Sequence, residues 1–515
     1  MAPLWCLTFI LPTALGSMYS DPNCAKGRTA ITHLFEWRWT DIADECERFL
    51  APYGYCGVQI SPPHENRIVT NPNRPWWERY QPVSFKLQTR SGTEQELKDM
   101  VARCNKVGVR IYGDSVINHM ASSSAAGYGT AGSTYNGSAL QFPGVPFGPS
   151  DFNDESTCHT ADLSIHDFQN VDEIRNCRLL GLVDLKLDKT SVRDKVIAYL
   201  NHLVDMGIAG FRLDAAKHMW PGDIIAIMDQ VHDLPSGTFG HNKRPFVFQE
   251  VIDTGNGEPI TGDQYLSSGR VTNFIYGAEL TKYFRKQKAM KLLADWGKGM
   301  MRSDDTIVFI DTQDTQRDHG DHGAPGDILS HFEPRAYKLA TAFMLAYPYG
   351  FPKIMSSYDF SLTDTNEGPP HNSDMSTKPV TIKSDMSCGN GWTCEHRWRP
   401  MYNMVAFRNV ASLSELNNWW SGSDYQIAFS RGNKAFIAFN LEGGDLEETL
   451  NTGLPSGDYC DVISGDLVNG KCTGKTVHVD ASGHAAIRVS GADQDPMLAI
   501  HAGAKVGSPI RRVGA

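Results

Sequence analysis

The sequence predicts an α/β fold in which eight short strands alternate with amphipathic helices. Runs of β-branched, aromatic and aliphatic residues recur from about residue 29 to residue 356, and helical patterns lie between them. Three of the runs end in a carboxylate. This alternation is typical of a (β/α)8 barrel, but an open doubly wound sheet has the same pattern, and periodicity alone does not separate the two.

The predicted strands take their bounds from these runs. They are Ala30–Leu34, Gly57–Ile60, Arg110–Val116, Gly210–Asp214, Pro245–Gln249, Val271–Phe274, Ile307–Ile310 and Phe351–Met355. Two helices between them have clear signals. Thr93 and Glu96 have the spacing of a capping box before an apolar stripe that ends near Gly108. A second stripe, within residues 192–204, is ended by Gly207.

Two other regions depart from this alternation. Residues 119–186 lack helix rhythm and are rich in Gly, Ser, Asn, Asp and Pro, and a loop of this length is unusual within a compact domain. After Trp420, the runs Tyr425–Ser430 and Lys434–Phe439 flank a turn and predict a hairpin, which further short strands follow to about residue 501. We therefore predict a C-terminal antiparallel β-sandwich over residues 421–502 and a disordered tail over 503–515.

The carboxylates at the strand ends indicate chemistry. Side chains alternate along a strand, so Arg212 and Asp214 point to the same side of a buried run. Glu250 and Asp314 end two further runs in the same way. Glycoside hydrolysis needs one carboxylate as nucleophile or base and another as proton donor, and a third can stabilise the charged transition state. The alternative for each acid alone is a strand-end cap or a buried ion pair.

Composition limits the classes of partner and compartment. A net charge of -11 argues against nucleic acid as a partner. The first 16 residues resemble a signal peptide, and their apolar run is too short to cross a bilayer. Removal of Cys6 with that segment leaves an even number of cysteines, which suits an oxidising compartment. We expect a secreted, extracellular protein without a membrane anchor.

Four segments resemble the signature regions of the α-amylases, in the order and at the spacing of that family. They are Asp114–His119, Gly210–His218, Phe248–Asp253 and Phe309–Asp314. The segments His33–Trp39, Arg74–Tyr80 and Met355–Tyr358 add to the likeness, which is greatest to animal enzymes and among these to arthropod digestive amylases. It covers about residues 19–502. The resemblance implies the closed barrel rather than the open sheet.

The same resemblance implies a division of the chain into domains. After the signal peptide, residues 17–118 and 187–420 would form the (β/α)8 barrel. Residues 119–186 would form a calcium-binding domain inserted after the third strand, and the β-sandwich would follow the barrel.

By resemblance, Asp214 is the nucleophile, Glu250 the general acid/base and Asp314 the third carboxylate. The reaction would be retaining, which predicts a separation of about 5–5.5 Å between the carboxyl groups of Asp214 and Glu250. Arg212 is expected to keep Asp214 ionised. The family's substrate-contacting positions correspond to Trp76, Trp77, Tyr80, Gln81, Asp114, His119, Lys217, Asp253, Gln313 and His319. For one of the two tryptophans, core packing is the expected role.

The resemblance also implies one structural Ca²⁺, because oxygen ligands suit this ion. Asn118 and Asp184 would bind through side-chain oxygens, and Arg175 and His218 through backbone carbonyls. It further implies four disulfides. Four pairs match the family, namely Cys46–Cys104, Cys158–Cys177, Cys388–Cys394 and Cys460–Cys472. Cys24 and Cys56 remain, and because they precede neighbouring predicted strands we expect a fifth bridge between them.

Two departures from the family concern the segment before Asp314. Animal amylases usually have Asn-His where this chain has Thr312 and Gln313. The asparagine is a chloride ligand, and Lys353 stands where the family has an arginine at the same ion, while Arg212 keeps its place. These differences predict weak chloride binding. Gln313 can exchange hydrogen bonds with a sugar but has a different reach and no charge.

The function predicted from the sequence is internal hydrolysis of α-1,4-glucosidic bonds in starch, glycogen and malto-oligosaccharides by a monomer. Two alternatives stay open. One is a carbohydrate-binding paralogue with weakened activity, which Gln313 favours and the three intact carboxylates oppose. The other is an α-glucosidase or transglycosylase of the same clan.

Overall fold

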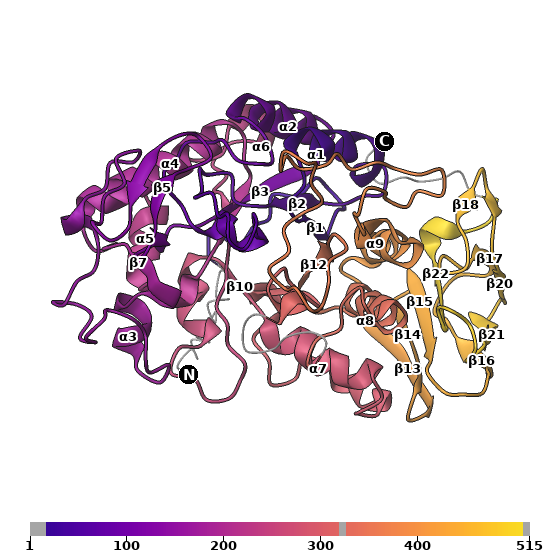
Figure 1. Ribbon diagram of the computed structural model, residues 1–515. Coiled ribbons are helices and arrows are strands. Elements are labelled where there is room, and N and C mark those ends of the chain that lie inside the picture. Colours follow the sequence, from indigo (N-terminus) through magenta and orange to yellow (C-terminus); the bar gives the residue numbers. More distant parts are fainter. Residues whose placement is uncertain (1–16, 319–325, 508–515) are drawn as a thin grey trace, which may run out of the picture.

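The computed structural model describes residues 17–318 and 326–507. The predicted signal peptide, His319 and residues 508–515 lie outside these ranges. Eight parallel strands close into a barrel at the centre of the molecule (Figure 1). Around the barrel their order is β1-β12-β11-β10-β9-β8-β3-β2, and β2 pairs with β1. Closure confirms the barrel and excludes the open sheet.

The barrel strands lie close to their predicted positions. They are β1 (Ile31–Leu34), β2 (Gly57–Ile60), β3 (Arg110–Ser115), β8 (Gly210–Leu213), β9 (Phe246–Gln249), β10 (Arg270–Thr272), β11 (Thr306–Val308) and β12 (Phe351–Ser356). The predicted end of β10 is wrong. Asn273 accepts a hydrogen bond from the backbone N–H of Tyr276 and caps helix α7, so Phe274 begins a helix instead of ending a strand.

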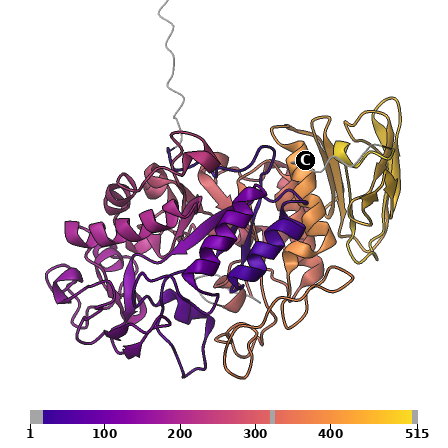
Figure 2. The same cartoon turned by 90° about the horizontal axis from the view of Figure 1, so that it is seen from above.

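Helices cover the outside of the barrel (Figure 2). Thr93 and Glu96 form the predicted capping box at the start of α2. The second predicted stripe forms α4, whose apolar side is buried. The α-helices are α1 (Trp39–Glu45), α2 (Glu94–Lys106), α3 (Val171–Asn176), α4 (Thr190–Asp205), α5 (Pro221–Met228), α6 (Ser236–Phe239), α7 (Phe274–Phe284), α8 (Pro334–Ala346) and α9 (Arg399–Ala411).

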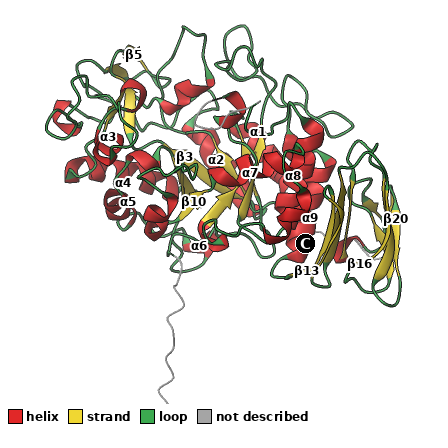
Figure 3. Ribbon diagram, turned by 90° about the horizontal axis from the view of Figure 1, so that it is seen from below, coloured by secondary structure: helices red, strands yellow, loops and turns green. Residues whose placement is uncertain are grey.

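The segment between β3 and β8 forms two small antiparallel pairs and the helix α3. Strand β4 (His119–Ser122) pairs with β7 (Leu182–Asp184), and β5 (Ala126–Tyr128) pairs with β6 (Thr134–Asn136). This segment lies at one end of the molecule, and the C-terminal strands lie at the other (Figures 1 and 3). The pairing of His119 with Asp184 brings the two ends of the segment together at the barrel.

The C-terminal region is an antiparallel β-sandwich, as predicted. Its larger sheet has the order β13-β14-β15-β22, and the predicted hairpin is the pair β14–β15. The larger sheet contains β13 (Leu416–Ser423), β14 (Gln426–Arg431), β15 (Ala435–Asn440) and β22 (Met497–His501). The remaining pairs join β16 (Leu446–Asn451) to β21 (His484–Val489), β17 (Gly457–Cys460) to β20 (Thr476–Val479), and β18 (Leu467–Val468) to β19 (Lys471–Cys472).

Two predicted limits of this region need correction. Strand β13 begins at Leu416, so the predicted boundary at residue 421 falls inside a strand. The predicted tail begins too early, because residues 503–507 are packed on the sandwich. Ala504 is buried, the backbone of Lys505 bridges to Tyr459, and the Lys505 ammonium donates to the carbonyl of Ser456.

The barrel and the sandwich share one continuous core. The rings of Phe284 and Phe343, on barrel helices α7 and α8, contact Phe439 of β15, and Phe343 also contacts Phe429 of β14. Arg431 donates to the carbonyl of Ala346 at the end of α8. One face of the larger sheet is therefore covered by barrel helices.

Disulfides join all five predicted pairs of cysteines. The bonds are Cys24–Cys56, Cys46–Cys104, Cys158–Cys177, Cys388–Cys394 and Cys460–Cys472. Within residues 17–318 and 326–507, the structure contains no helix that is long and apolar enough to span a membrane.

Candidate active site

The guanidinium of Arg212 is the centre of a cluster of acids at the carboxyl ends of neighbouring barrel strands. Its Nη1 atom donates to Asp114 Oδ1 at 2.6 Å and to Asp214 Oδ1 at 2.8 Å, and its Nη2 atom donates to Glu250 Oε1 at 2.5 Å. All four side chains are nearly or fully buried. A single cation thus holds three carboxylates together, two of which are the predicted nucleophile and general acid/base.

Glu250 is held by a second donor, which comes from the turn after strand β8. The backbone N–H of Ala215 donates to Glu250 Oε2 at 2.9 Å, and Ala215 has a left-handed backbone with φ of 50°. Non-glycine residues adopt this conformation mainly where the surrounding structure requires it. The turn after Asp214 therefore fixes the position of Glu250. No described residue forms a hydrogen bond with Asp214 Oδ2, so this oxygen is available to a ligand.

Burial and mutual repulsion raise the pKa values of aspartates in this cluster. Burial raises the pKa of Asp214 well above its usual value, and the neighbouring Glu250 and Asp114 act in the same direction while Arg212 opposes them. Burial also raises the pKa of Asp314 to about 7, again with Glu250 contributing. Arg212 lowers the pKa of Asp214, as expected, but burial and the neighbouring acids raise it by more, because one guanidinium faces three acids.

A chain of hydrogen bonds joins the aromatic segment at residues 76–80 to the acids. Tyr80 donates through its hydroxyl to Asp114 Oδ2 at 3.0 Å, and Gln313 Nε2 donates to that hydroxyl at 3.2 Å. The Oε1 atom of Gln313 is buried without a partner among the described residues. Gln313 therefore lies in the cluster with an acceptor that a sugar hydroxyl can satisfy.

The other predicted substrate positions surround this cluster in different environments. Trp77 is partly exposed and Trp76 is 3 % exposed, with its ring against Phe35, so core packing applies to Trp76. His119 lies within hydrogen-bond distance of the carbonyl of Tyr80, and Gln81 accepts from the Arg67 guanidinium.

Two further predicted positions, Lys217 and Asp253, form hydrogen bonds to the loop after β9. Lys217 donates to the carbonyl of Ile252 at 2.6 Å. The carboxylate of Asp253 accepts the backbone N–H groups of Gly255 and Gly262 and so shapes this loop.

Of the predicted chloride residues, Thr312 is engaged in a turn, whereas Lys353 is bonded to the buried network around Arg212. Lys353 is buried, donates to Gln59 Oε1 at 3.2 Å, and has a pKa lowered to about 8 by burial and by Arg212. Gln59 in turn donates to Asp114. The hydroxyl of Thr312 instead accepts the backbone N–H of Thr315 at 3.2 Å and caps the following turn. Gln59 was not predicted, although a lone amide in the apolar strand β2 is a signal that could have identified it.

The four predicted calcium ligands line one cavity of about 80 Å³ between the inserted segment and the barrel. Asp184 is buried, and burial raises its pKa well above the usual value. Its carboxylate accepts the amides of Asn118 at 3.3 Å and Asn153 at 2.6 Å, and no ion pair to Asp184 occurs among the described residues. Asn153 also lines the cavity and was not predicted.

Asp184 is the only acid among the predicted calcium ligands, although Asp188 and Asp223 also line the cavity. No cluster of three or more His, Cys, Asp or Glu side chains suited to a metal occurs in the described ranges. The predicted ligand set contains a single carboxylate and uses amide and carbonyl oxygens for the rest.

Comparisons with known proteins agree with this geometry. The family model of the α-amylase catalytic domain matches residues 76–247. The family model of the α-amylase C-terminal all-β domain matches residues 419–503. The chain is 58% identical over 498 residues to an α-amylase of Pecten maximus, covering 96% of this chain and 97% of that protein. It is 54% identical over 499 residues to a pancreatic α-amylase of Rattus norvegicus, covering 94% and 97%.

A solved structure adds a likeness in three dimensions. The crystal structure of a substituted α-amylase I from Eisenia fetida in complex with maltohexaose has a TM-score of 0.88 and 45% identity, covering 93% of this chain and 98% of that one. The predicted closeness to arthropod enzymes stays a prediction. High identity to α-amylases over nearly the full length shows that this chain belongs to the animal-type α-amylases of the glycoside hydrolase family.

Proposed function

We propose that the chain cuts internal α-1,4-glucosidic bonds of starch and glycogen with retention, and that Asp214 and Glu250 carry the chemistry. The observation that supports this most strongly is the shared guanidinium of Arg212, which holds the two carboxylates side by side at adjoining strand ends. A short separation of the two groups is what a retaining mechanism requires. The maltohexaose bound by the Eisenia fetida relative supports the substrate class.

In the first step, the free Oδ2 of Asp214 attacks the anomeric carbon while Glu250 gives a proton to the glycosidic oxygen. The carbon–oxygen bond to the leaving sugar breaks, and a covalent glycosyl ester forms on Asp214. In the second step, the Glu250 carboxylate takes a proton from water, and the water oxygen displaces Asp214. Glu250 lies beside Asp214 on the same guanidinium, which supports its role as the proton donor in the first step.

Asp314 and Gln313 would bind the sugar at the point of cleavage. Asp314 lies close enough to Glu250 and Arg212 for their charges to affect its pKa, which supports a place on the ring that undergoes reaction. The remaining contacts to the sugar chain would come from Tyr80, Trp77, Gln81, His119 and Lys217. His319 belongs to the same proposal by resemblance alone.

A test of the function measures products from amylose after brief digestion. An endo-acting hydrolase gives a mixture of oligosaccharides at once. Glucose as the only early product would indicate an α-glucosidase, and products longer than the substrate would indicate a transglycosylase. Binding of amylose without any product would favour the carbohydrate-binding paralogue.

We propose that the cavity around Asp184 holds a structural Ca²⁺. A buried carboxylate without a cationic partner is unfavourable, so a cation there would stabilise the fold. Asn118 would contribute its amide oxygen after a turn of the amide group, and Arg175 and His218 would contribute carbonyls, none of which accepts a described backbone hydrogen bond. His218 lies four residues after Asp214, so an ordered site here would fix the turn that carries the nucleophile.

We further propose that chloride binds weakly between Arg212 and Lys353. Both cations are present in the barrel interior, but the hydroxyl of Thr312 is engaged with Thr315.

We also propose that the protein is secreted as a monomer after removal of residues 1–16, which the similarity to pancreatic α-amylases supports. The negative net charge supports the absence of nucleic-acid partners.

A further inference from the structure

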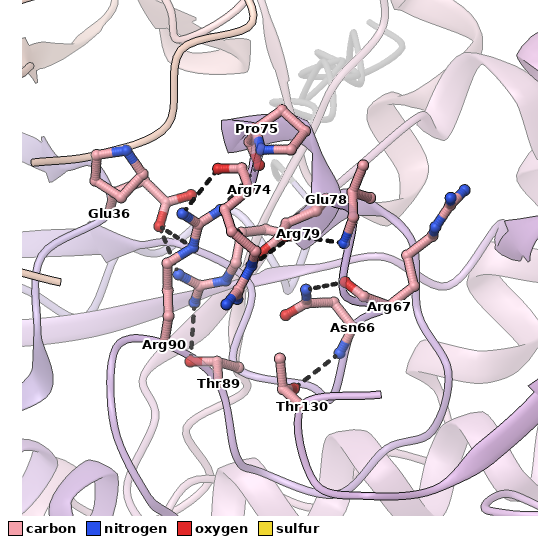
Figure 4. Close-up of polar contacts among 12 residues, drawn as sticks. Glu36, Asn66, Arg67, Arg74, Pro75, Glu78, Arg79, Thr89, Arg90 and Thr130 are labelled. Carbon is pink, nitrogen blue, oxygen red and sulfur yellow. Dashed lines mark hydrogen bonds and ion pairs between the residues drawn. The ribbon is translucent and has the colours of Figure 1, made fainter. Parts of the chain in front are cut away.

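A network of charged side chains includes Glu78 and Arg79 of the aromatic segment and none of the catalytic acids (Figure 4). Arg79 pairs with Glu36 at 2.8 Å, Arg74 pairs with Glu78 at 2.7 Å, and Arg90 lies between both acids. The side chains of Arg79, Glu36 and Glu78 are fully buried, and that of Arg90 is 5% exposed. Such a group costs much to desolvate, so its role is not explained by stability alone.

Arg90 makes the contacts that tie the network to the backbone. Its Nη1 atom donates to the carbonyl of Arg74 at 3.1 Å and its Nη2 atom to the carbonyl of Pro75 at 2.8 Å. Nη2 also lies 3.0 Å from Glu78, and Nε lies 3.6 Å from Glu36. One planar guanidinium thus joins the backbone before the aromatic segment to Glu36, which lies in the loop after barrel strand β1.

Two residues of the network have a backbone conformation that surrounding contacts must stabilise. Glu36 has a φ of 66° and Arg74 a φ of 47°, which are left-handed values that non-glycine residues rarely adopt. Strained positions of this kind persist only where surrounding contacts determine them. Arg90 contacts both residues: its guanidinium lies beside the carboxylate of Glu36 and donates to the backbone carbonyl of Arg74.

The segment that these contacts hold is a short 3-10 helix, Trp76–Tyr80. Helices of this type have poor hydrogen-bond geometry and depend on outside contacts. The two ends are held differently. At the far end, Tyr80 is bound to Asp114 and Gln313. At the near end, Arg90 binds the carbonyls immediately before Trp76.

We propose that Arg90 is a positioning residue that sets the place of Trp77 for binding sugars away from the point of cleavage. The inference rests on the proposed substrate role of this segment. Loss of the two hydrogen bonds from the Arg90 guanidinium would release the N-terminal end of the 3-10 helix, while Tyr80 at its other end stays bound to the catalytic cluster. Binding of long substrates would weaken, and the chemical step would not, because uniform binding energy affects KM without kcat.

The test compares Arg90→Lys and Arg90→Met with the parent on maltoheptaose and on a short aryl α-maltoside. Lysine keeps the charge but cannot bind two carbonyls and two carboxylates together. We expect KM for maltoheptaose to rise at least about 5-fold in Arg90→Lys and more in Arg90→Met, with kcat within about 2-fold. KM for the short substrate should change less than about 2-fold. Arg103→Met is the matched control, since Arg103 forms exposed ion pairs with Glu47 and Asp44.

Each other outcome has a defined meaning. An unchanged KM for maltoheptaose, or equal losses on both substrates, would overturn the positioning role. Failure of both variants to fold would assign Arg90 to stability and would also overturn it. Inactivity of the parent on maltoheptaose would reject the proposed function itself.

Discussion

Arg212 and Asp114 face each other on strands β8 and β3, and the guanidinium donates to the carboxylate at 2.6 Å. The same guanidinium also binds Asp214 and Glu250. The negative charge of Glu250 raises the pKa values of Asp114 and Asp214. A substitution that removes this charge lowers the pKa values of those two aspartates.

Glu250→Gln should abolish turnover while the fold is kept. Glutamine can still accept the N–H of Ala215, but it cannot deliver a proton to the glycosidic oxygen. We expect a loss of kcat of at least about 10²-fold on amylose. Glu279→Gln is the control, because Glu279 forms partly exposed ion pairs with Lys282 and Lys288, away from the catalytic cluster. Near-parental hydrolysis by Glu250→Gln would remove Glu250 from the mechanism.

Asp314→Asn should become more stable relative to the parent as pH rises. An aspartate titrates near 3.8 in the unfolded chain, and burial raises the pKa of Asp314 to about 7 in the folded protein. Between these values the folded state keeps a proton that the unfolded state has lost, so parental stability falls with rising pH. The difference in Tm, variant minus parent, should increase from pH 4 to 7 and then level off. Calorimetry across this range checks it, and a constant difference would contradict it.

Removal of calcium should lower the Tm of the parent and leave Asp184→Asn nearly unaffected. A ligand that binds only the folded state at 100 Kd stabilises it by about 2.7 kcal/mol. The measurement is thermal unfolding with calcium and with EDTA. Asp172→Asn, an exposed substitution in helix α3, should keep the full calcium shift. A calcium shift of parental size in Asp184→Asn would place the ion elsewhere.

Thr312→Asn should increase activation by chloride. In the parent the hydroxyl of Thr312 caps the turn at Thr315, whereas an asparagine amide can reach further into the barrel. A chloride titration of starch hydrolysis should show a weak response for the parent and a stronger one for the variant. Strong activation of the parent by millimolar chloride would show that Thr312 does not impair the anion site.

Gln313→His should change turnover without changing the response to chloride. Gln313 is bound to Tyr80 in the catalytic cluster, so its replacement acts at the sugar and not at the anion. We expect a higher kcat on starch, measured at fixed chloride, with a chloride titration as the control. A changed chloride midpoint would mean that residues 312 and 313 act as one unit.

Sequence patterns were sufficient for the parts of the fold that depend on local signals. The capping box at Thr93 and the hairpin around Gly432 are local, and both formed as predicted. The end of β10 was wrong because Asn273 has two roles, as the residue after a strand and as the cap of a helix. Closure of the barrel was not determined by periodicity, since an open sheet has the same alternation.

Contacts of the candidate site could not be predicted from the sequence where they join distant residues or use backbone atoms. Lys353 and Gln59 are bonded although 294 residues separate them, and no spacing rule connects them. Carbonyl ligands such as that of His218 have no signature in the side chains. Asn153 and Arg90 were missed for the same reason, because their partners are defined only after folding.

The shared core of barrel and sandwich has a consequence for synthesis and engineering. The last strand of the larger sheet, β22, ends at His501, so the ribosome must reach that residue before the sheet is complete. Until then, the aromatic rings of Phe284 and Phe343 on the nascent barrel lack their cover. A shortened enzyme that stops before β13 would expose the same rings permanently. We expect such a fragment to aggregate, so grafting this catalytic unit onto another protein requires its C-terminal sheet.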